Sequence, residues 1–375
     1  MSPFGLSSIA WPLIGPPARG TPASPHDAFC RTMLPLTSRT FALSIEALPD
    51  DLASSVRVAY LLCRTVDTIE DDPVLPWETR ASLFDEFAAL VQDDTRSPGT
   101  LEQMSAALSS GTDALLCQHS TAVFHCFRNL SPETREKIRP FVLEMTSGMR
   151  EYAARTATKG RFELRDLPDL ERYCYFVAGT VGKLLTALFL TSVPLDTERR
   201  QIVEQHDVSF GLGLQLVNIV KDVAADMERG VCFIPRALAD AHNVPLARFL
   251  DPVFRPQALK VVAELCARAR EHLARAEEYT LAWPAKEGLE VRRFCAVPLS
   301  LALASLDEVE HGPNALRPGL TPKVSRATVL GTLVATALAI DSDVKLRALF
   351  AMARGRHVLH TRVGDIADWL RGHPL

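Results

Sequence analysis

The 375-residue chain has little net charge and no long apolar run. The first absence argues against nucleic-acid binding, and the second argues against a membrane-spanning helix. Its formal net charge is −4 at pH 7, whereas a general nucleic-acid binder is clearly basic, so we expect no nucleic-acid partner. The apolar stretch at 329–340 is too short to span a bilayer. The first residues show no basic segment followed by an apolar core, so we expect no signal peptide.

The sequence also lacks a CxxC pair, although it contains eight cysteines. Most of them lie in apolar stretches, where a free cysteine behaves as a small hydrophobic residue. One cluster of possible zinc ligands is present, formed by Cys117, His119, His125 and Cys126. Its spacing matches no common zinc pattern. We therefore expect free thiols in a reducing compartment and a cytoplasmic protein.

Alternating runs of Val, Ile and Thr are absent too, so β-strands have little support. From about residue 28 the pattern is helical almost throughout and rich in Ala and Leu. Residues 1–27 differ, because they carry six prolines and three glycines and show no apolar period. We predict a flexible leader over 1–27 and a single all-α domain over 28–375, with helix breaks at the prolines that follow residues 72, 193 and 283.

The first informative segment is the helix predicted over Leu48–Asp72, which Asp50 or Asp51 can cap and which the following proline stops. One face of it is apolar. A second face carries polar side chains at helical spacing, namely Tyr60, Arg64, Asp67 and Asp71, with Glu70 beside them. Three acids within five residues repel one another. The plain alternative is a solvated helix end, where acidic residues are common.

A second helix, predicted over Phe210–Gly230, has the same character. Its polar positions i, i+3, i+7 and i+11 are Gln215, Asn218, Asp222 and Asp226. The remaining residues are mostly Leu, Val, Ile and Ala, so we expect this helix and its polar face to be buried. Buried carboxylates are costly unless something pairs with them. The two acidic faces together predict one shared cation site.

The type of cation follows from the ligands. Aspartate and asparagine oxygens without His or Cys partners favour Mg²⁺, which uses one or two carboxylates plus substrate phosphate oxygens. The predicted chemistry is diphosphate binding and assisted departure of the leaving group. Gly211 and Gly213 lie inside the second helix, so they predict close packing on a neighbouring backbone rather than a dinucleotide-binding loop.

At this point the segments resemble the squalene/phytoene synthase family. Residues 37–45 and 60–72, which read TSRTFALSI and YLLCRTVDTIEDD, are similar to its first signature, and 214–230, LQLVNIVKDVAADMERG, to its second. Between them, 173–182 reads YCYFVAGTVG. The later blocks FCAVP at 294–298 and KVSRATV at 323–329 favour the squalene synthase branch. The resemblance spans about residues 28–345.

The resemblance implies a single isoprenoid synthase bundle of helices around a central cavity, with the two aspartate motifs facing each other across it. It implies a prenyltransferase of isoprenoid biosynthesis that condenses two farnesyl diphosphates to presqualene diphosphate and reduces this to squalene with NADPH, in the presence of Mg²⁺. We expect a monomer with peripheral membrane contact at most.

The resemblance also assigns residues. The metal ligands would be Asp67, Glu70, Asp71, Asp222 and Asp226, and these aspartates would act in catalysis together with Tyr173. The diphosphate would be bound by Ser38, Arg39, Arg64, Gln215, Asn218 and Lys221. Lys323 and Arg326 are weaker candidates for contact with NADPH.

Four positions depart from the family pattern. Lys221 replaces an arginine, Ala225 replaces an acid, Val231 stands where an arginine usually follows the glycine, and Leu299 stands where glutamine is frequent. The first three lie at the diphosphate end of the second motif. They leave open a phytoene- or dehydrosqualene-type synthase without reduction, another prenyl product, or a catalytically silent helical scaffold.

Overall fold

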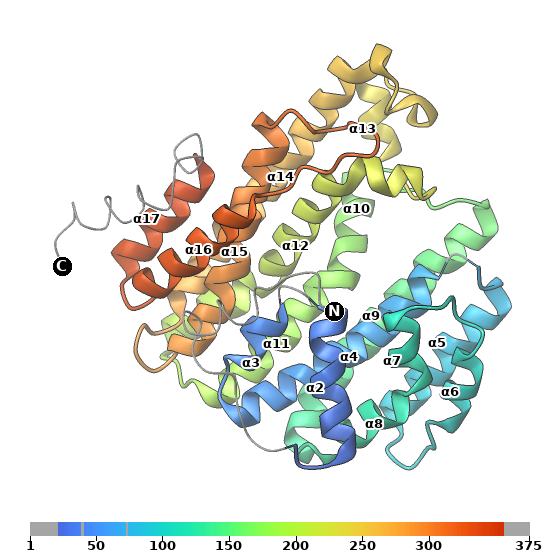
Figure 1. Ribbon diagram of the computed structural model, residues 1–375, viewed down its shortest axis with the longest axis vertical. Coiled ribbons are helices and arrows are strands. Elements are labelled where there is room, and N and C mark those ends of the chain that lie inside the picture. The colour runs from blue at the N-terminus through green and yellow to red at the C-terminus, as the bar shows by residue number, and fades with distance from the viewer. Residues whose placement is uncertain (1–21, 39–40, 73, 356–375) are drawn as a thin grey trace. The chain divides into compact units, whose positions relative to one another are not determined.

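The structure is a computed structural model that describes residues 22–38, 41–72 and 74–355. Every regular element in these ranges is helical and none is a strand, which confirms the predicted all-α class (Figure 1). The first described helix, α2 (Pro25–Thr37), begins inside the range predicted as leader, with Ser24 as its N-cap. Residues 1–21 lie outside the described ranges, so the leader stays a prediction.

The described chain forms two compact units. The N-terminal unit contains residues 22–162 and 172–194, and the C-terminal unit contains 163–171 and 195–355. The chain passes from one to the other at residues 162–163, 171–172 and 194–195, so the units are not consecutive domains joined by one linker. The prediction of one domain over 28–375 remains a prediction.

The N-terminal unit is built around α4 (Asp50–Asp71), which contacts α2, α7, α8, α9 and α11 (Figure 1). Its other helices are α3 (Phe41–Glu46), α5 (Trp77–Gln92), α6 (Gly99–Ser105), α7 (Thr112–Gln118), α8 (Ser120–Asn129), α9 (Pro132–Lys159), α10 (Leu167–Cys174, shared with the C-terminal unit) and α11 (Thr180–Ser192). The predicted apolar stripe of α4 is buried against these neighbours, including Leu52, Val56, Leu62 and Val66.

The start of α4 differs from the prediction, whereas its end agrees. The N-cap is Pro49, and no side chain caps the helix, so the prediction of an aspartate cap is wrong. Asp50 and Asp51 instead occupy the first turn, where negative charge interacts favourably with the helix dipole. The helix ends at Asp71. Asp72 then accepts hydrogen bonds from the backbone N–H groups of Val74, Leu75 and Ser109, which lower the pKa of its carboxyl despite the opposing effect of burial.

The C-terminal unit is organised by the pairing of α12 (Thr197–Glu228) with α14 (Arg255–Ala282), with α15 (Leu289–His311) against both. Its remaining helices are α13 (Arg236–Ala241), α16 (Arg326–Ala339) and α17 (Asp343–Arg354). A Cβ at Gly213 would lie 3.2 Å from the backbone nitrogen of Leu273, so this glycine lets α12 approach α14 closely. The predicted packing role of Gly213 is confirmed.

A left-handed glycine ends α12. Gly230 has φ +83°, a conformation that residues with a side chain rarely adopt. The backbone N–H of Val231 then bonds back to the carbonyl of Asp226 at 2.9 Å, and the N–H of Gly230 bonds to Met227 at 3.1 Å. These bonds satisfy carbonyls that have no partner within the helix. The acidic motif of α12 is therefore held in the last turns before a fixed helix end.

Two helical stretches, Leu167–Ser192 and Thr197–Glu228, are long and apolar enough to cross a membrane. Packing accounts for the apolar side of the second stretch, because α12 buries residues such as Leu216, Ile219 and Val223 against α14 and α15. In the first stretch, α11 packs on α4 and α9 of its own unit.

Candidate active site

Arg64 lies at the centre of the polar face of α4. Its Nε donates to Oδ1 of Asp113 at 3.1 Å and its Nη2 to Oδ2 of Asp113 at 2.7 Å, while Nη1 pairs with Asp67. Burial disfavours the charged guanidinium, but the two carboxylates more than compensate, so the pKa of Arg64 is raised. Asp113 lies in the first turn of α7, outside the sequence motifs, so no local signal in the sequence predicts its contact with Arg64.

The three acids of the first motif interact with one another but differ in burial. Burial raises the pKa of Asp67 to about 7, and the charge of Asp71 adds to this effect, whereas Arg64 opposes it. The pKa of Glu70 is raised well above its usual value by burial and by the charges of Asp71 and Asp67. Asp71 is exposed. The repulsion predicted from the spacing of these acids is thus present, and Arg64 beside Asp67 and Arg80 beside Glu70 compensate only part of it.

One carboxyl oxygen of Glu70 is buried without a hydrogen bond. This oxygen, Oε2, is inaccessible to solvent and has no hydrogen-bond partner, although the carboxyl group is hydrogen-bonded to Tyr173. A buried carboxylate oxygen without a partner is costly. This oxygen is therefore suited to accept an additional positively charged ligand.

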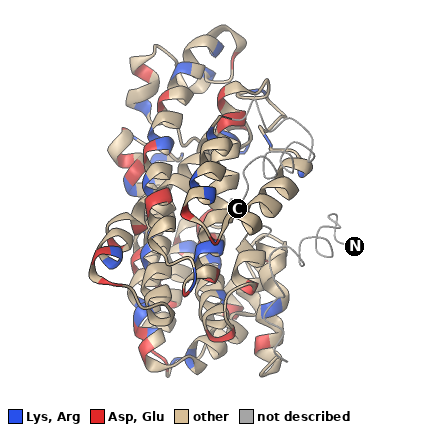
Figure 2. Cartoon of the chain, turned by 90° about the vertical axis from the view of Figure 1, so that its left-hand side faces the viewer, with Lys and Arg blue, Asp and Glu red and all other residues tan. Residues whose placement is uncertain are grey.

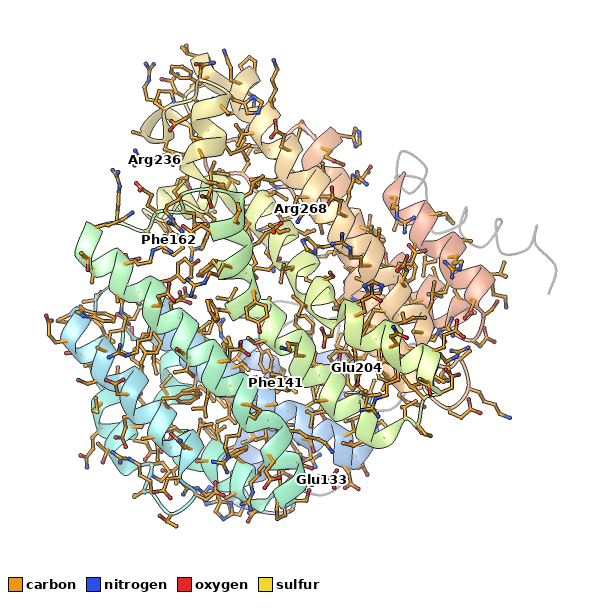
Figure 3. All side chains as sticks on the ribbon, turned by 180° about the vertical axis from the view of Figure 1, so that it is seen from behind. Glu133, Phe141, Phe162, Glu204, Arg236 and Arg268 are labelled. Atoms are coloured by element: carbon orange, nitrogen blue, oxygen red, sulfur yellow. The ribbon has the colours of Figure 1, made fainter. Side chains whose placement is uncertain are left out.

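Tyr173, on α10, is only 5% exposed. Burial, followed by the charges of Glu70 and Asp71, raises the pKa of its phenol well above the usual value, so the hydroxyl keeps its proton at neutral pH. Its ring is fixed by edge contacts with Tyr152 at 5.1 Å and with Phe162 at 5.3 Å, the latter labelled in Figure 3. The structure thus brings Tyr173 together with the first acidic motif, a contact for which the sequence has no local signal.

A π-helical turn follows Tyr173 directly. Residues Tyr175–Gly179 form this turn, η1, between α10 and α11. Gly148 of α9 lies so close to it that a Cβ there would be 2.0 Å from Cγ of Phe176. Single π-helical turns are frequent at functional sites. Here the turn lies between α10, which carries Tyr173, and the start of α11.

The segment before α3 contains two predicted diphosphate ligands. Ser38 is buried, and its hydroxyl accepts a hydrogen bond from the backbone N–H of Phe41 at 3.0 Å. Beside it, the hydroxyl of Tyr60 donates to the carbonyl of Thr37 at 2.9 Å. Arg39 lies outside the described residues. In the structure, Ser38 therefore stabilises the start of α3, and its binding role stays a prediction.

The second motif lies on α12 of the C-terminal unit. Asp226 is buried, and burial raises the pKa of its carboxyl, while an ion pair with Arg229 opposes the rise. Lys221 pairs with the neighbouring Asp222, whose side chain is 32% exposed. Lys221, which departs from the family pattern, thus still supplies a positive charge next to an aspartate of the motif.

The predicted burial of the polar face of α12 holds only in part. Asn218 is exposed and Gln215 is partly exposed, so burial is confined to the Asp226 end of the face. Amide side chains that reach solvent need no protein partner, which accounts for their place in an otherwise apolar helix. The shared cation site of the two motifs remains a prediction.

The two weaker candidates, those for contact with NADPH, are exposed like Asn218. Lys323 lies in the segment before α16, and Arg326 begins that helix after the N-cap Ser325. Elsewhere, basic and acidic residues are interspersed along the helices (Figure 2).

The donor set of α4 fits a hard divalent cation. It offers carboxylate oxygens alone, one of them buried and without a partner, and Mg²⁺ prefers oxygen ligands. Within residues 22–38, 41–72 and 74–355, no group of three or more His, Cys, Asp or Glu side chains could hold a metal ion by itself. A cation at this face would therefore need further oxygen ligands, such as those of a diphosphate.

Comparison with known proteins identifies the family. The family model for squalene/phytoene synthase matches residues 34–328. Squalene synthase of Schizosaccharomyces pombe is 28% identical over 300 residues, which cover 80% of this chain and 63% of that enzyme. Squalene synthase 1 of Panax ginseng is 29% identical over 314 residues, covering 81% and 70%. The chain spans less than two thirds of the length of the fission-yeast relative.

Solved structures show the same fold. A ligand complex of the squalene synthase TcSQS has a TM-score of 0.74 at 24% identity and covers 92% of this chain and 95% of that chain. A dehydrosqualene synthase has a TM-score of 0.56 at 20% identity, covering 82% and 93%. The all-α architecture and the two acidic motifs agree with the family match over most of the sequence. This chain belongs to the squalene/phytoene synthase family.

Proposed function

We propose that the chain is a prenyltransferase that condenses two molecules of farnesyl diphosphate to presqualene diphosphate, followed by reduction with NADPH to squalene. The relatives named above support this reaction. The observation that carries it is the cluster on α4, where Arg64 lies between two carboxylates and Glu70 joins the acidic motif to Tyr173.

Arg64 is suited to bind the diphosphate. Its guanidinium is oriented by the bidentate contact with Asp113, so little side-chain freedom is left to lose on binding. The Nη1 group now paired with Asp67 can turn to a phosphate oxygen. Asp113 keeps the arginine in place during this exchange.

Asp67, Glu70 and Asp71 would hold Mg²⁺ in the N-terminal unit, and Asp222 and Asp226 would hold it in the C-terminal unit. The bound ion would neutralise charge on the leaving diphosphate. The raised pKa values of Asp67, Glu70 and Asp226 support this proposal, because a carboxylate with a raised pKa favours an added positive charge.

In the proposed condensation, the C–O bond of the donor breaks and its diphosphate leaves with the electron pair. The double bond of the acceptor attacks the allylic cation and forms a C–C bond. Loss of a proton then closes the cyclopropane, and the released diphosphate accepts that proton. Tyr173 keeps its own proton and acts by hydrogen bonding, because its phenol is buried beside carboxylates.

A second candidate is the same condensation without reduction. Lys323 and Arg326, the predicted NADPH contacts, are exposed side chains before and at the start of α16. Two exposed basic side chains do not by themselves form an NADPH site, so the proposed reduction rests on the relatives named above. Product analysis distinguishes the two candidates.

We also propose that the protein is a cytoplasmic monomer that contacts membranes only peripherally. The substrate is amphiphilic and the product apolar, which favours such contact. Flotation with phosphatidylcholine vesicles tests it: recovery of the protein with the vesicles supports the proposal, and recovery entirely in the soluble fraction contradicts it.

The reaction is tested by incubating the purified chain with farnesyl diphosphate and Mg²⁺, with and without NADPH, and identifying products by mass spectrometry. Squalene formed only with NADPH supports the full proposal. Presqualene diphosphate or dehydrosqualene under both conditions supports the second candidate. No turnover, with geranylgeranyl diphosphate also inert, contradicts both and favours the silent scaffold.

Two substitutions test whether both acidic motifs take part in the reaction. Asp67→Asn and Asp226→Asn should each lower turnover about a hundredfold or more, the effect typical of losing a group that stabilises transition-state charge. Asp85→Asn is the matched control, because Asp85 is an exposed acid on α5, outside the sequence of both motifs, and pairs with Arg150.

A further inference from the structure

Two cysteines from distant parts of the sequence meet in the N-terminal unit. The Sγ of Cys30, on α2, lies 3.7 Å from the Sγ of Cys126, on α8, as a hydrogen-bonded thiol pair. Both thiols are free. Other cysteine sulfurs contact carbonyl oxygens instead, as Cys117 contacts Thr65 and Cys232 contacts Ile234.

The two thiols have different surroundings. Cys30 is fully buried, whereas Cys126 is partly exposed. The thiol of Cys30 donates its hydrogen bond to Cys126, which lowers the pKa of Cys126, and Arg57 contributes in the same direction. The pKa of Cys30 is raised by the same hydrogen bond and by burial. Burial and Asp27 oppose this lowering in part. A partly exposed thiol with a lowered pKa beside a buried second thiol is the arrangement of an attacking and a resolving cysteine.

The helices that carry these cysteines are held in register around the pair. The rings of His26 and His125, the latter next to Cys126 in sequence, lie 4.2 Å apart. On the other side, Asp27 of α2 pairs with the buried Arg57 of α4. The sulfur atoms are therefore kept adjacent by contacts other than their own, 3.7 Å apart against the roughly 2 Å of a disulfide bond.

We propose that Cys30 and Cys126 form a dithiol site that low-molecular-weight disulfides oxidise to an intramolecular disulfide. The Cys126 thiolate attacks the small disulfide, forms a mixed disulfide and releases one small thiolate. The Cys30 sulfur then loses its proton, attacks the Cys126 sulfur and releases the second small thiol. In balance, two protein thiols and one small disulfide give one protein disulfide and two small thiols.

The new bond would tie α2 to α8 across 96 residues of sequence. A cross-link over a loop of this length restricts the unfolded chain strongly, so the oxidised protein should melt at a higher temperature. The same bond would restrain α2, whose last residue, Thr37, precedes Ser38 and accepts the hydrogen bond from Tyr60.

The test uses the full-length protein, reduced and then treated with oxidised glutathione. Remaining thiols are blocked with iodoacetamide, and peptides are mapped without reduction. Before blocking, the intact mass should fall by two hydrogen atoms. The peptide map should contain a pair linked through Cys30 and Cys126. The melting temperature should rise by several degrees and return after treatment with dithiothreitol.

Three variants make the result specific. Cys126→Ser and Cys126→Ala should both lose the linked peptide and the rise in melting temperature, and agreement between them excludes a folding defect of one variant. Cys232→Ser, which removes another partly exposed thiol, should behave as the unmodified chain. A stable glutathione adduct on Cys126 without the link, a link between other cysteines, or no reaction of the folded chain would each overturn the proposal.

Discussion

Asp113 holds the guanidinium of Arg64 through two hydrogen bonds, at 3.1 and 2.7 Å, while the third nitrogen of the same group pairs with Asp67. The arginine thus links a helix outside the signature motifs to the first aspartate of the acidic motif. The side chain of Asp113 is 38% exposed, so its contact with Arg64, and not burial, explains where this side chain lies. This relationship makes Asp113 a positioning residue for the proposed diphosphate site.

Replacing Asp113 should therefore weaken substrate binding. Asp113→Asn removes one charge-assisted bidentate contact, worth about 1–2 kcal/mol, and KM for farnesyl diphosphate should rise about tenfold with a smaller change in kcat. Asp113→Glu should restore part of the loss. Steady-state kinetics measure both values, with Asp85→Asn as the control. An unchanged or lower KM in Asp113→Asn would show that Arg64 needs no such partner.

The high pKa of Asp67 predicts a pH-dependent response to Mg²⁺. The folded carboxyl titrates at about 7 and the unfolded one near its ordinary value of 3.8. Between these values the folded chain binds more protons, so the contribution of Asp67 to stability falls as pH rises from about 4 to about 7. Mg²⁺ needs the deprotonated carboxylate, so it should stabilise the protein more at pH 8 than at pH 6.

Thermal melts with inorganic pyrophosphate, with and without Mg²⁺, measure this difference at the two pH values. Asp67→Asn should remove most of the pH dependence of the Mg²⁺ effect, whereas Asp85→Asn should retain it. An equal rise in melting temperature at pH 6 and pH 8 in the unmodified chain would be inconsistent with a titrating Asp67 ligand.

Gly148→Ala tests the contact between α9 and the π-helical turn. The new methyl group would lie 2.0 Å from the ring of Phe176, and such overpacking costs about 1–3 kcal/mol even though alanine favours a helix over glycine. Urea unfolding measures the loss. Gly99→Ala is the matched control, because its nearest contact, Ser97, lies at 3.6 Å. Equal stability of the two variants would contradict the close approach.

Arg57 provides a stability test that is independent of catalysis. It is 1% exposed and pairs with Asp27 of α2 and Glu46 of α3. Arg57→Met leaves Glu46 without its arginine and Asp27 with Arg31 alone, so the free energy of unfolding should fall by about 3–5 kcal/mol. Arg150→Met breaks the exposed pair with Asp85 and should cost about 1 kcal/mol or less. Similar losses in both variants would show that burial of Arg57 matters little.

The predictions from sequence succeeded where the signal was local. The α4 helix, its apolar stripe and its end before residue 73 follow from helical spacing and a proline, which act over a few residues. The packing role of Gly213 could be predicted in the same way. The family could be predicted from ordered blocks of residues, and the match over residues 34–328 confirms it.

Two predictions, the N-cap of α4 and the burial of the polar face of α12, differ from the structure, and each difference has a physical cause. Asp50 was a reasonable N-cap by residue type, yet Pro49 takes that position and leaves the aspartate in the first turn. The polar face of α12 was expected to be buried because its other residues are apolar. Helical periodicity specifies which residues share a face, but the neighbouring elements decide how much of that face they cover, and they leave Asn218 exposed.

The sequence by itself determined the helices, the alignment of the acids along α4 and α12, and the family. Only the tertiary structure decided which distant side chains meet: Asp113 with Arg64, Tyr173 with Glu70, and Cys30 with Cys126. Backbone hydrogen bonding and side-chain spacing within a helix depend on residues a few positions apart. Contacts between helices depend on how the whole unit packs, and residues far apart in the sequence can be neighbours there.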